Sequence, residues 1–122
     1  MNGPANRELF LNKLKRSSEV IITVTGRKTE KKFSTPVWFV LEGEEKVLLV
    51  PNTGSDNNWF KDLAKDPRIE LSLYEIAIQS KARLVRDSKQ VETILDKFRA
   101  KYTSAWSESY YTKRDVYAEV PL

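Results

Sequence analysis

The chain has 122 residues, of which 40% are hydrophobic and 31% are charged, a balance typical of a folded globular protein. It contains neither cysteine nor histidine, which excludes disulfides, thiolate nucleophiles, histidine-based catalytic triads and most transition-metal sites, so no metal is expected. The net charge of +4 is concentrated in residues 1–35, which hold eight basic and three acidic side chains and indicate an anionic partner, either a phosphorylated small molecule or nucleic acid.

The predicted elements are short strands interrupted by short helices. Asn6 is a candidate cap for a helix over Arg7–Lys15, and the β-branched run Glu19–Thr25 predicts the first strand. Pro36 lies inside the second predicted strand, Phe33–Leu41. Because proline has no N–H to donate, it indicates a sheet edge, a bulge or a place where something other than a strand lies alongside. The remaining predicted elements are a strand over Lys46–Val50, a helix over Asn58–Lys65, strands over Arg68–Tyr74 and Ile76–Arg86, a helix from Asp87 or Ser88 to about Tyr102, and a final strand through Val116, Ala118 and Val120.

Six short strands joined mostly by hairpins predict a mainly β fold, in which an antiparallel sheet curls into a barrel with helices outside. The length predicts a single domain over residues 1–122. The apolar runs are far shorter than the roughly 20 residues that span a membrane, and no stretch of signal-peptide type is visible. We therefore expect a cytoplasmic protein without a membrane span.

The most distinctive segment runs from Gly26 to Phe39. A glycine turn carries cations to the rim of the predicted sheet, and the following strand offers hydroxyls, a proline and aromatic side chains. Arginine, lysine and hydroxyl groups together suit a phosphate, although a charged hairpin tip leading into a core strand has the same composition. The candidate anion contacts are Arg27, Lys28, Lys31 and Lys32, followed by Ser34 and Thr35.

A second candidate segment, Pro51–Trp59, is rich in glycine, serine and asparagine and leads into a predicted helix. Free N–H groups at such a helix start can hold an anion. The alternative is an ordinary connection capped by Asp56 or Asn57. The two segments flank one predicted hairpin, so both can contribute to a single anion site.

These motifs resemble the deazaflavin-dependent nitroreductase family, in the flavin-binding split β-barrel superfamily that includes pyridoxamine-phosphate-oxidase-like proteins. The resemblance implies a six-stranded antiparallel split β-barrel, and split barrels often place the cofactor groove near a subunit interface, so a homodimer is expected. That family usually has a glycine where Glu30 stands and a basic residue where Phe33 stands. The resemblance rests on Val24-Thr25-Gly26-Arg27-Lys28-Thr29, Thr35-Pro36-Val37-Trp38-Phe39, the loop from Asn52 to Trp59 with Leu63, and Asp66-Pro67.

The resemblance also implies a cofactor, either a deazaflavin of the coenzyme F420 type or FMN, in a groove on the barrel surface. The basic residues of the first segment would meet its phosphate or acidic tail. The residues that would line the ring are Ser34, Thr35, Pro36, Val37 and Trp38. Those that would close over it are Asn52, Thr53, Gly54, Ser55, Asn58 and Trp59. Two tyrosines would lie on the substrate side unless they only pack a terminal lobe on the barrel, namely Tyr110 and Tyr111.

Three functions follow. The leading one is a small oxidoreductase that passes hydride from the bound deazaflavin or flavin to a small electron-poor acceptor, such as a quinone or nitro compound. The second is a protein on the same fold that binds a flavin or phosphorylated ligand without turnover. The third is a nucleic-acid-binding small barrel, which is disfavoured because the aromatic residues are not interleaved with the basic ones.

Overall fold

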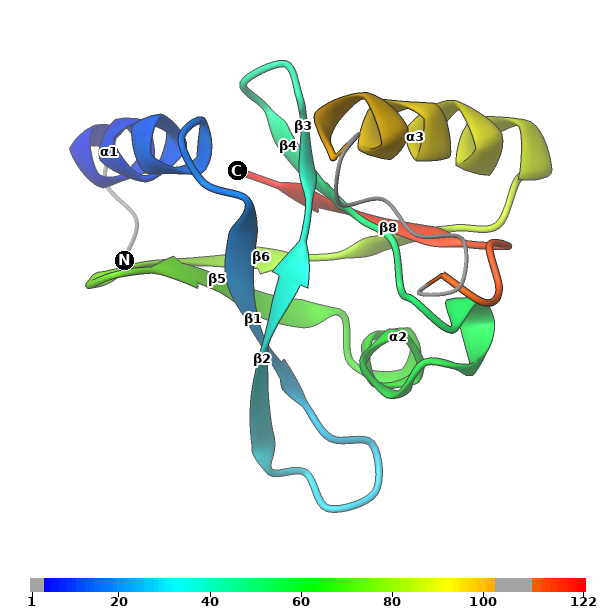
Figure 1. Cartoon of the computed structure of the whole chain (residues 1–122). Coiled ribbons are helices and arrows are strands. Elements are labelled where there is room, and N and C mark those ends of the chain that lie inside the picture. The colour runs from blue at the N-terminus through cyan, green and yellow to red at the C-terminus, as the bar shows by residue number, and fades with distance from the viewer. Residues whose placement is uncertain (1–3, 103–110) are drawn as a thin grey trace.

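The computed structural model describes residues 4–102 and 111–122, which form two antiparallel sheets of four strands each and three α-helices (Figure 1). The helices are α1 (Pro4–Leu14), α2 (Asn58–Lys65) and α3 (Ser88–Lys101), and a 3₁₀ turn, η1 (Gly54–Asp56), precedes α2. The first sheet has the strand order β2 (Lys32–Trp38), β1 (Glu19–Thr25), β5 (Arg68–Leu73), β6 (Ile76–Lys81). The second has the order β3 (Val40–Glu42), β4 (Lys46–Leu49), β8 (Tyr117–Pro121), β7 (Arg83–Val85).

The prediction of six strands in one barrel is corrected to eight strands in two sheets. Two predicted strands each break where the chain passes from the first sheet to the second, at Phe39 between β2 and β3 and at Ala82 between β6 and β7. Among residues 4–102 and 111–122, the pairing therefore shows two sheets connected through these crossing points and no closed barrel. The mainly β class with flanking helices is confirmed, and the arrangement is consistent with a split barrel.

The crossing at Phe39 is held by Tyr102, the residue that follows α3. The Tyr102 hydroxyl accepts a hydrogen bond from the Phe39 N–H at 3.0 Å and lies 2.6 Å from the Phe39 carbonyl oxygen and 2.8 Å from that of Ser18. Its ring stacks on Trp38 with the centroids 4.6 Å apart, and burial raises the pKa of Tyr102 to about 12. The Lys101 ammonium also donates to the Phe39 carbonyl, and burial lowers its pKa to about 8. These contacts satisfy the backbone of Phe39 between the two sheets.

The helices follow local sequence signals closely. α2 has the predicted bounds, and the Asn57 side chain caps it by accepting hydrogen bonds from the N–H groups of Trp59 and Phe60. Asp87 caps α3 in the same way. α1 begins at Pro4 instead of Arg7, because proline is well suited to a first helical turn, and Asn6 lies inside the helix.

Two hydrophobic clusters stabilise the fold. The larger one lies between the two sheets and includes the apolar faces of α1 and α2, among them Phe10, Phe60 and Leu63. The smaller one lies between α3 and the other face of the second sheet (Figure 1). Full burial of each large side chain contributes about 1.5–3 kcal/mol, so the clusters fix α2 and α3 firmly against the sheets. The described helices include none with the length and apolar character required to cross a bilayer.

Candidate functional site

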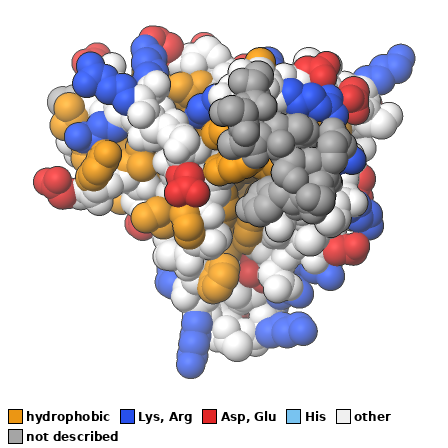
Figure 2. Space-filling model, in the orientation of Figure 1, with side chains coloured by type: hydrophobic (Ala, Val, Ile, Leu, Met, Phe, Trp, Pro, Cys, Tyr) orange, Lys and Arg blue, Asp and Glu red, His pale blue; other side chains and the backbone are white. Residues whose placement is uncertain are grey.

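Residues 26–31 form the loop that joins β1 to β2 and extends away from both sheets (Figure 1). The Gly26 N–H donates to the Lys31 carbonyl, and the Glu30 N–H donates to the Gly26 carbonyl, both at 2.9 Å. The loop backbone is thus hydrogen-bonded to itself, and residues 28–31 are exposed. Figure 2 shows Lys and Arg side chains gathered around the tip of this projection. The predicted cations Lys28, Lys31 and Lys32 are all exposed here.

Arg27 is held against α2. Its backbone N–H donates to the Asp62 carboxylate at 3.1 Å, and its guanidinium donates to the same oxygen at 2.7 Å. The guanidinium also contacts the Asn58 carbonyl at 3.3 Å, and the Lys65 ammonium donates to the Arg27 carbonyl at 2.8 Å. Asp62 is only 6% exposed. The α2 helix therefore fixes the position of the loop through this buried ion pair.

Asp62 was missed by the sequence analysis, although a signal for it exists. It lies three residues after Trp59 and next to Leu63, on the apolar face of a short helix. A carboxylate on a buried face requires a partner, because an unpaired buried charge is costly. The cationic loop predicted nearby was the natural source of that partner.

A cavity of about 410 Å³ lies between loop 26–31 and α2. Both predicted segments contribute to this cavity: the second segment provides Asn58, and the first provides the cationic side chains. Phe33 also lines the cavity and is 52% exposed. The lining residues are Gly26, Arg27, Lys28, Thr29, Lys31, Lys32, Phe33, Asn58 and Asp62.

Glu30 occupies a strained backbone conformation in this loop. Its φ is 61°, in the left-handed region that favours glycine. Glu30→Gly is therefore expected to stabilise the protein by about 1 kcal/mol, because relief of the strain exceeds the extra entropy of glycine in the unfolded chain. The free energy of unfolding in urea measures the change. Glu30→Gln, which removes the charge and keeps the strain, should stay close to the wild type; equal gains in both variants would assign the effect to charge.

The predicted ring-lining strand, β2, is an edge strand of the first sheet, which agrees with the first of the three alternatives for Pro36. The Ser34 hydroxyl is exposed and hydrogen-bonds the Thr23 hydroxyl at 2.7 Å. Val37 packs against the larger hydrophobic cluster and Trp38 against the smaller one. The strand thus offers hydroxyls and an outer backbone edge at one end, while its other end belongs to the core.

The second predicted segment, Pro51–Trp59, forms hydrogen bonds mainly with residues near the C-terminal end, Thr112 and Asp115. The Thr112 N–H donates to the Asn52 carbonyl at 2.8 Å, and Ser55 donates to the Asp115 carboxylate through its N–H at 2.9 Å and its hydroxyl at 2.6 Å. These bonds lower the pKa of the Asp115 carboxyl against the opposing effect of burial. Of the six residues expected to close over the cofactor, Asn58 alone lines the cavity. Thr53 and Gly54 lie at the 3₁₀ turn η1, which Ser55 connects to Asp115. Trp59 is buried in the larger hydrophobic cluster.

The structure describes one of the two tyrosines expected on the substrate side. Tyr110 lies outside the described residues. Tyr111 is 1% exposed, with its ring centroid 6.1 Å from that of Trp38 and 6.3 Å from that of Phe98. Its position is that of a packing residue under α3.

Three solved structures share this fold. An F420-H2 dependent reductase has a TM-score of 0.60 and 18% identity, covering 84% of this chain and 93% of its own. A domain-swapped dimer has a TM-score of 0.65 and 20% identity, covering 97% and 99%. A putative pyridoxamine 5'-phosphate oxidase from Listeria innocua has a TM-score of 0.67 and 11% identity, covering 95% and 91%.

The sequence itself matches a family. Residues 8–120 match the model of the F420H(2)-dependent quinone reductase family. The matched residues include the cationic loop, α2, α3, the larger part of α1 and every strand except the last residue of β8. This match agrees with the resemblance to deazaflavin-dependent enzymes and favours a deazaflavin over FMN. The chain therefore belongs to the F420H(2)-dependent quinone reductase family and is a deazaflavin-dependent oxidoreductase.

Proposed function

We propose that this protein passes hydride from a reduced deazaflavin to a small electron-poor acceptor, such as a quinone or a nitro compound. The observation that carries the proposal is the cavity beside α2, which is lined by two exposed lysines of loop 26–31, by the exposed Lys32 at the start of β2, and by the exposed ring of Phe33. The family match supplies the class of cofactor.

The residues present fit the anionic end of such a cofactor. Lys28, Lys31 and Lys32 have no ion-pair partner among residues 4–102 and 111–122, so their ammonium groups are available to a phosphate. Arg27 differs, because Asp62 already takes one of its guanidinium nitrogens. We therefore assign the principal charge contacts to the lysines and a positioning contribution to Arg27.

When bound, the reduced deazaflavin supplies the hydride, and the chain's own residues bind and orient it. The lysines of loop 26–31 hold the anionic end. Ser34, Thr35 and the outer backbone edge of β2 offer donors and acceptors for the edge of a flat ring, and Phe33 offers an apolar surface. Because loop and strand are joined through the closed backbone of residues 26–31, fixing one end of the cofactor also fixes its ring.

We further propose that the protein forms a homodimer and works in the cytoplasm. A solved structure of the same fold is a domain-swapped dimer, which supports the first point, and the sequence composition supports the second. Light scattering at micromolar concentration measures the mass, and a value corresponding to one chain would contradict the dimer.

A titration tests the proposed reaction. The purified protein is mixed with oxidised and reduced coenzyme F420 and, separately, with FMN, and binding is followed by fluorescence. We expect micromolar or tighter binding of coenzyme F420, weaker binding of FMN, and oxidation of the reduced cofactor when a quinone is added. Tight binding without oxidation in the presence of quinones and nitro compounds would instead favour a binding protein without turnover.

A further inference from the structure

A cavity of about 310 Å³ lies between α3 and the second sheet and shares no lining residue with the cavity at loop 26–31. Strands β3, β7 and β8 supply one wall, and α3 supplies the other. The volume is about ten times that of one water molecule in the liquid, so it suits a small molecule. The charged lining residues are Glu42, Arg83, Lys97 and Glu119.

The strand register places two polar side chains of β8 on the side of the sheet that faces α3. Glu119 pairs with Leu48 of β4 and with Arg83 of β7. Tyr117, two residues earlier, pairs with Val85. Residues two apart on a strand share a face, and Leu48 and Val85 belong to the hydrophobic cluster under α3. β8 therefore presents a phenol and a carboxylate toward α3, and both line the cavity.

The Tyr117 hydroxyl has no hydrogen-bond partner within residues 4–102 and 111–122, although the residue is only 3% exposed. A buried polar group without a partner costs free energy, which a ligand with a hydrogen-bonding group would offset. Burial raises the pKa of Tyr117, and the carboxylates of Glu119 and Glu42 raise it further. The hydroxyl is thus protonated in a negative electrostatic environment, where it suits a cationic donor.

Glu119 also has unused hydrogen-bonding capacity. It is 7% exposed, and its Oε1 accepts a hydrogen bond from the Arg83 guanidinium at 2.6 Å. Its Oε2 lies 3.8 Å from the Lys46 ammonium, which is an ion pair too long for a hydrogen bond. An ionised carboxylate offers about four acceptor positions, so this buried group is only partly satisfied by its neighbours in the described ranges.

The charges around the cavity balance. Two carboxylates, Glu42 and Glu119, stand against two cations, Arg83 and Lys97. Glu42 and Lys97 form no ion pair with any residue that the structure describes, and the Arg83 side chain is 68% exposed. Both signs of charge are therefore available to a ligand, and a ligand with one charge of each sign would leave the site neutral.

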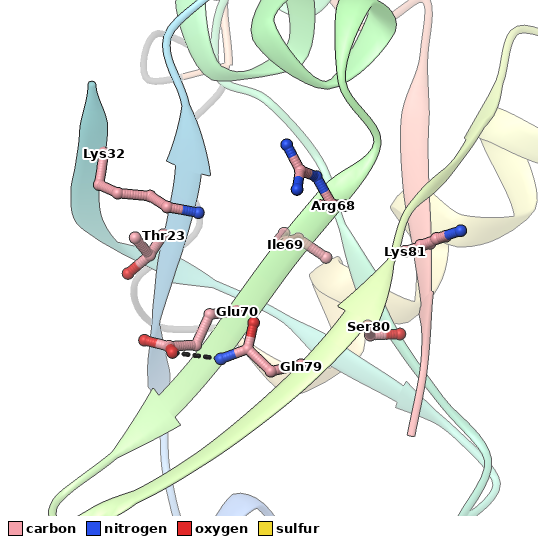
Figure 3. A pocket seen from close by; sticks show the side chains of 8 residues that line it. All are labelled: Thr23, Lys32, Arg68, Ile69, Glu70, Gln79, Ser80 and Lys81. Atoms are coloured by element: carbon pink, nitrogen blue, oxygen red, sulfur yellow. Dashed lines mark hydrogen bonds between the residues drawn. The ribbon is translucent and has the colours of Figure 1, made fainter. Parts of the chain in front are cut away.

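A larger cavity of about 460 Å³, on the outer face of the first sheet, is built differently (Figure 3). Among its described lining residues only the apolar Ile69 is buried, and the Gln79 amide donates to the Glu70 carboxylate. The other polar groups there are open to water, which can hydrogen-bond them. The cavity under α3 differs because its polar groups Tyr117 and Glu119 are buried.

We propose that the cavity under α3 binds a small zwitterion of the α-amino-acid class. The ammonium group of the ligand meets Glu42, Glu119 and the Tyr117 hydroxyl, and its carboxylate meets Arg83 and Lys97. The site is separate from the cavity at loop 26–31, so this inference does not depend on the proposed reaction. A ligand that connects α3 to β8 stabilises the folded state by mass action.

Calorimetric titration of the purified protein with each proteinogenic amino acid tests the proposal. We expect at least one of them to bind with a Kd in the millimolar range or lower and to raise the temperature of unfolding. Propylamine and propionate each carry only one of the two charges and should bind far more weakly. Equal binding of either probe would overturn the assignment to a zwitterion, and failure of every amino acid to bind would overturn the site.

Two variants test the residues against the best-binding amino acid. Tyr117→Phe should raise its Kd about tenfold and leave the unliganded protein at least as stable as the wild type, because no hydrogen bond within the described chain is lost. Lys97→Gln should raise the Kd about two- to fivefold. Lys89→Gln, which removes an equal charge from α3 outside the cavity, is the matched control and should keep the wild-type Kd.

Three results would overturn the site. The first is a wild-type Kd in both Tyr117→Phe and Lys97→Gln. The second is an equal loss of affinity in Lys89→Gln. The third is a marked loss of stability in unliganded Tyr117→Phe, which would show that the hydroxyl is satisfied within the protein itself.

Discussion

Asp62→Ala is expected to weaken deazaflavin binding by about tenfold or more and to destabilise the fold by about 2–3 kcal/mol. The carboxylate accepts hydrogen bonds from both the backbone and the guanidinium of Arg27, and it is almost fully buried. Removing one partner of a buried pair costs about 3–5 kcal/mol, and we reduce this figure because the Arg27 side chain is 25% exposed. The freed loop must then be ordered by the cofactor, which lowers affinity.

Asp62→Ala should weaken cofactor binding without slowing turnover at saturating cofactor. Asp62 acts through Arg27, so the Kd for the cofactor should rise while kcat at saturating cofactor stays near the wild-type value. Asp62→Asn keeps an acceptor for the Arg27 N–H and should lie between the wild type and Asp62→Ala. In the double variant with Arg27→Gln, the loss should be far smaller than the sum of the single losses.

Asp96→Ala is the matched control, because it removes an ion pair with Arg99 on the exposed face of α3. Exposed pairs contribute only about 0–1 kcal/mol, so this variant should fold and bind normally. A large fall in kcat with an unchanged Kd in Asp62→Ala would contradict a positioning role and would point to a group that acts in the reaction itself.

The sequence predicted correctly those features that depend on neighbouring residues. The bounds of α2 follow from the Asn57 cap, the spacing of Trp59, Phe60 and Leu63, and the Asp66-Pro67 end, all within eleven residues. The edge position of β2 was one of the three alternatives that the chemistry of a single residue, Pro36, allowed. Each of these signals is local, so no knowledge of the tertiary structure was required.

The features that were missed depend on contacts between distant residues. The break between β2 and β3 at Phe39 is held by Tyr102, 63 positions away, and the segment that begins at Asn52 is tied to Asp115, 60 positions beyond Ser55. Residue types identified the cations of the site, yet only the structure shows that Arg27 is engaged by Asp62 while three lysines remain free among the described residues. Composition gives the kinds of group available, and tertiary contacts decide which of them are left for a ligand.

Gly54→Ala is expected to destabilise the protein by about 3 kcal/mol. Gly54 has a φ of 58°, where alanine is strained by about 1–2 kcal/mol. An added Cβ would also lie 2.2 Å from the Asp115 carboxylate and 2.8 Å from the Lys113 carbonyl oxygen. The turn must therefore move away from Asp115 and lose the hydrogen bonds of Ser55, which are charge-assisted and contribute about 1.5–3 kcal/mol.

Gly43→Ala isolates that contact from the backbone strain. Gly43 also has a φ of 58°, but an added Cβ would meet no atom within 4 Å, so its cost should be the strain alone, about 1 kcal/mol. Urea unfolding of both variants measures the difference. Gly54→Ala should also raise the cofactor Kd, because the same turn leads into Asn57, the cap of the helix that carries Asp62. Equal losses of stability in the two variants would show that the turn does not depend on its contact with Asp115.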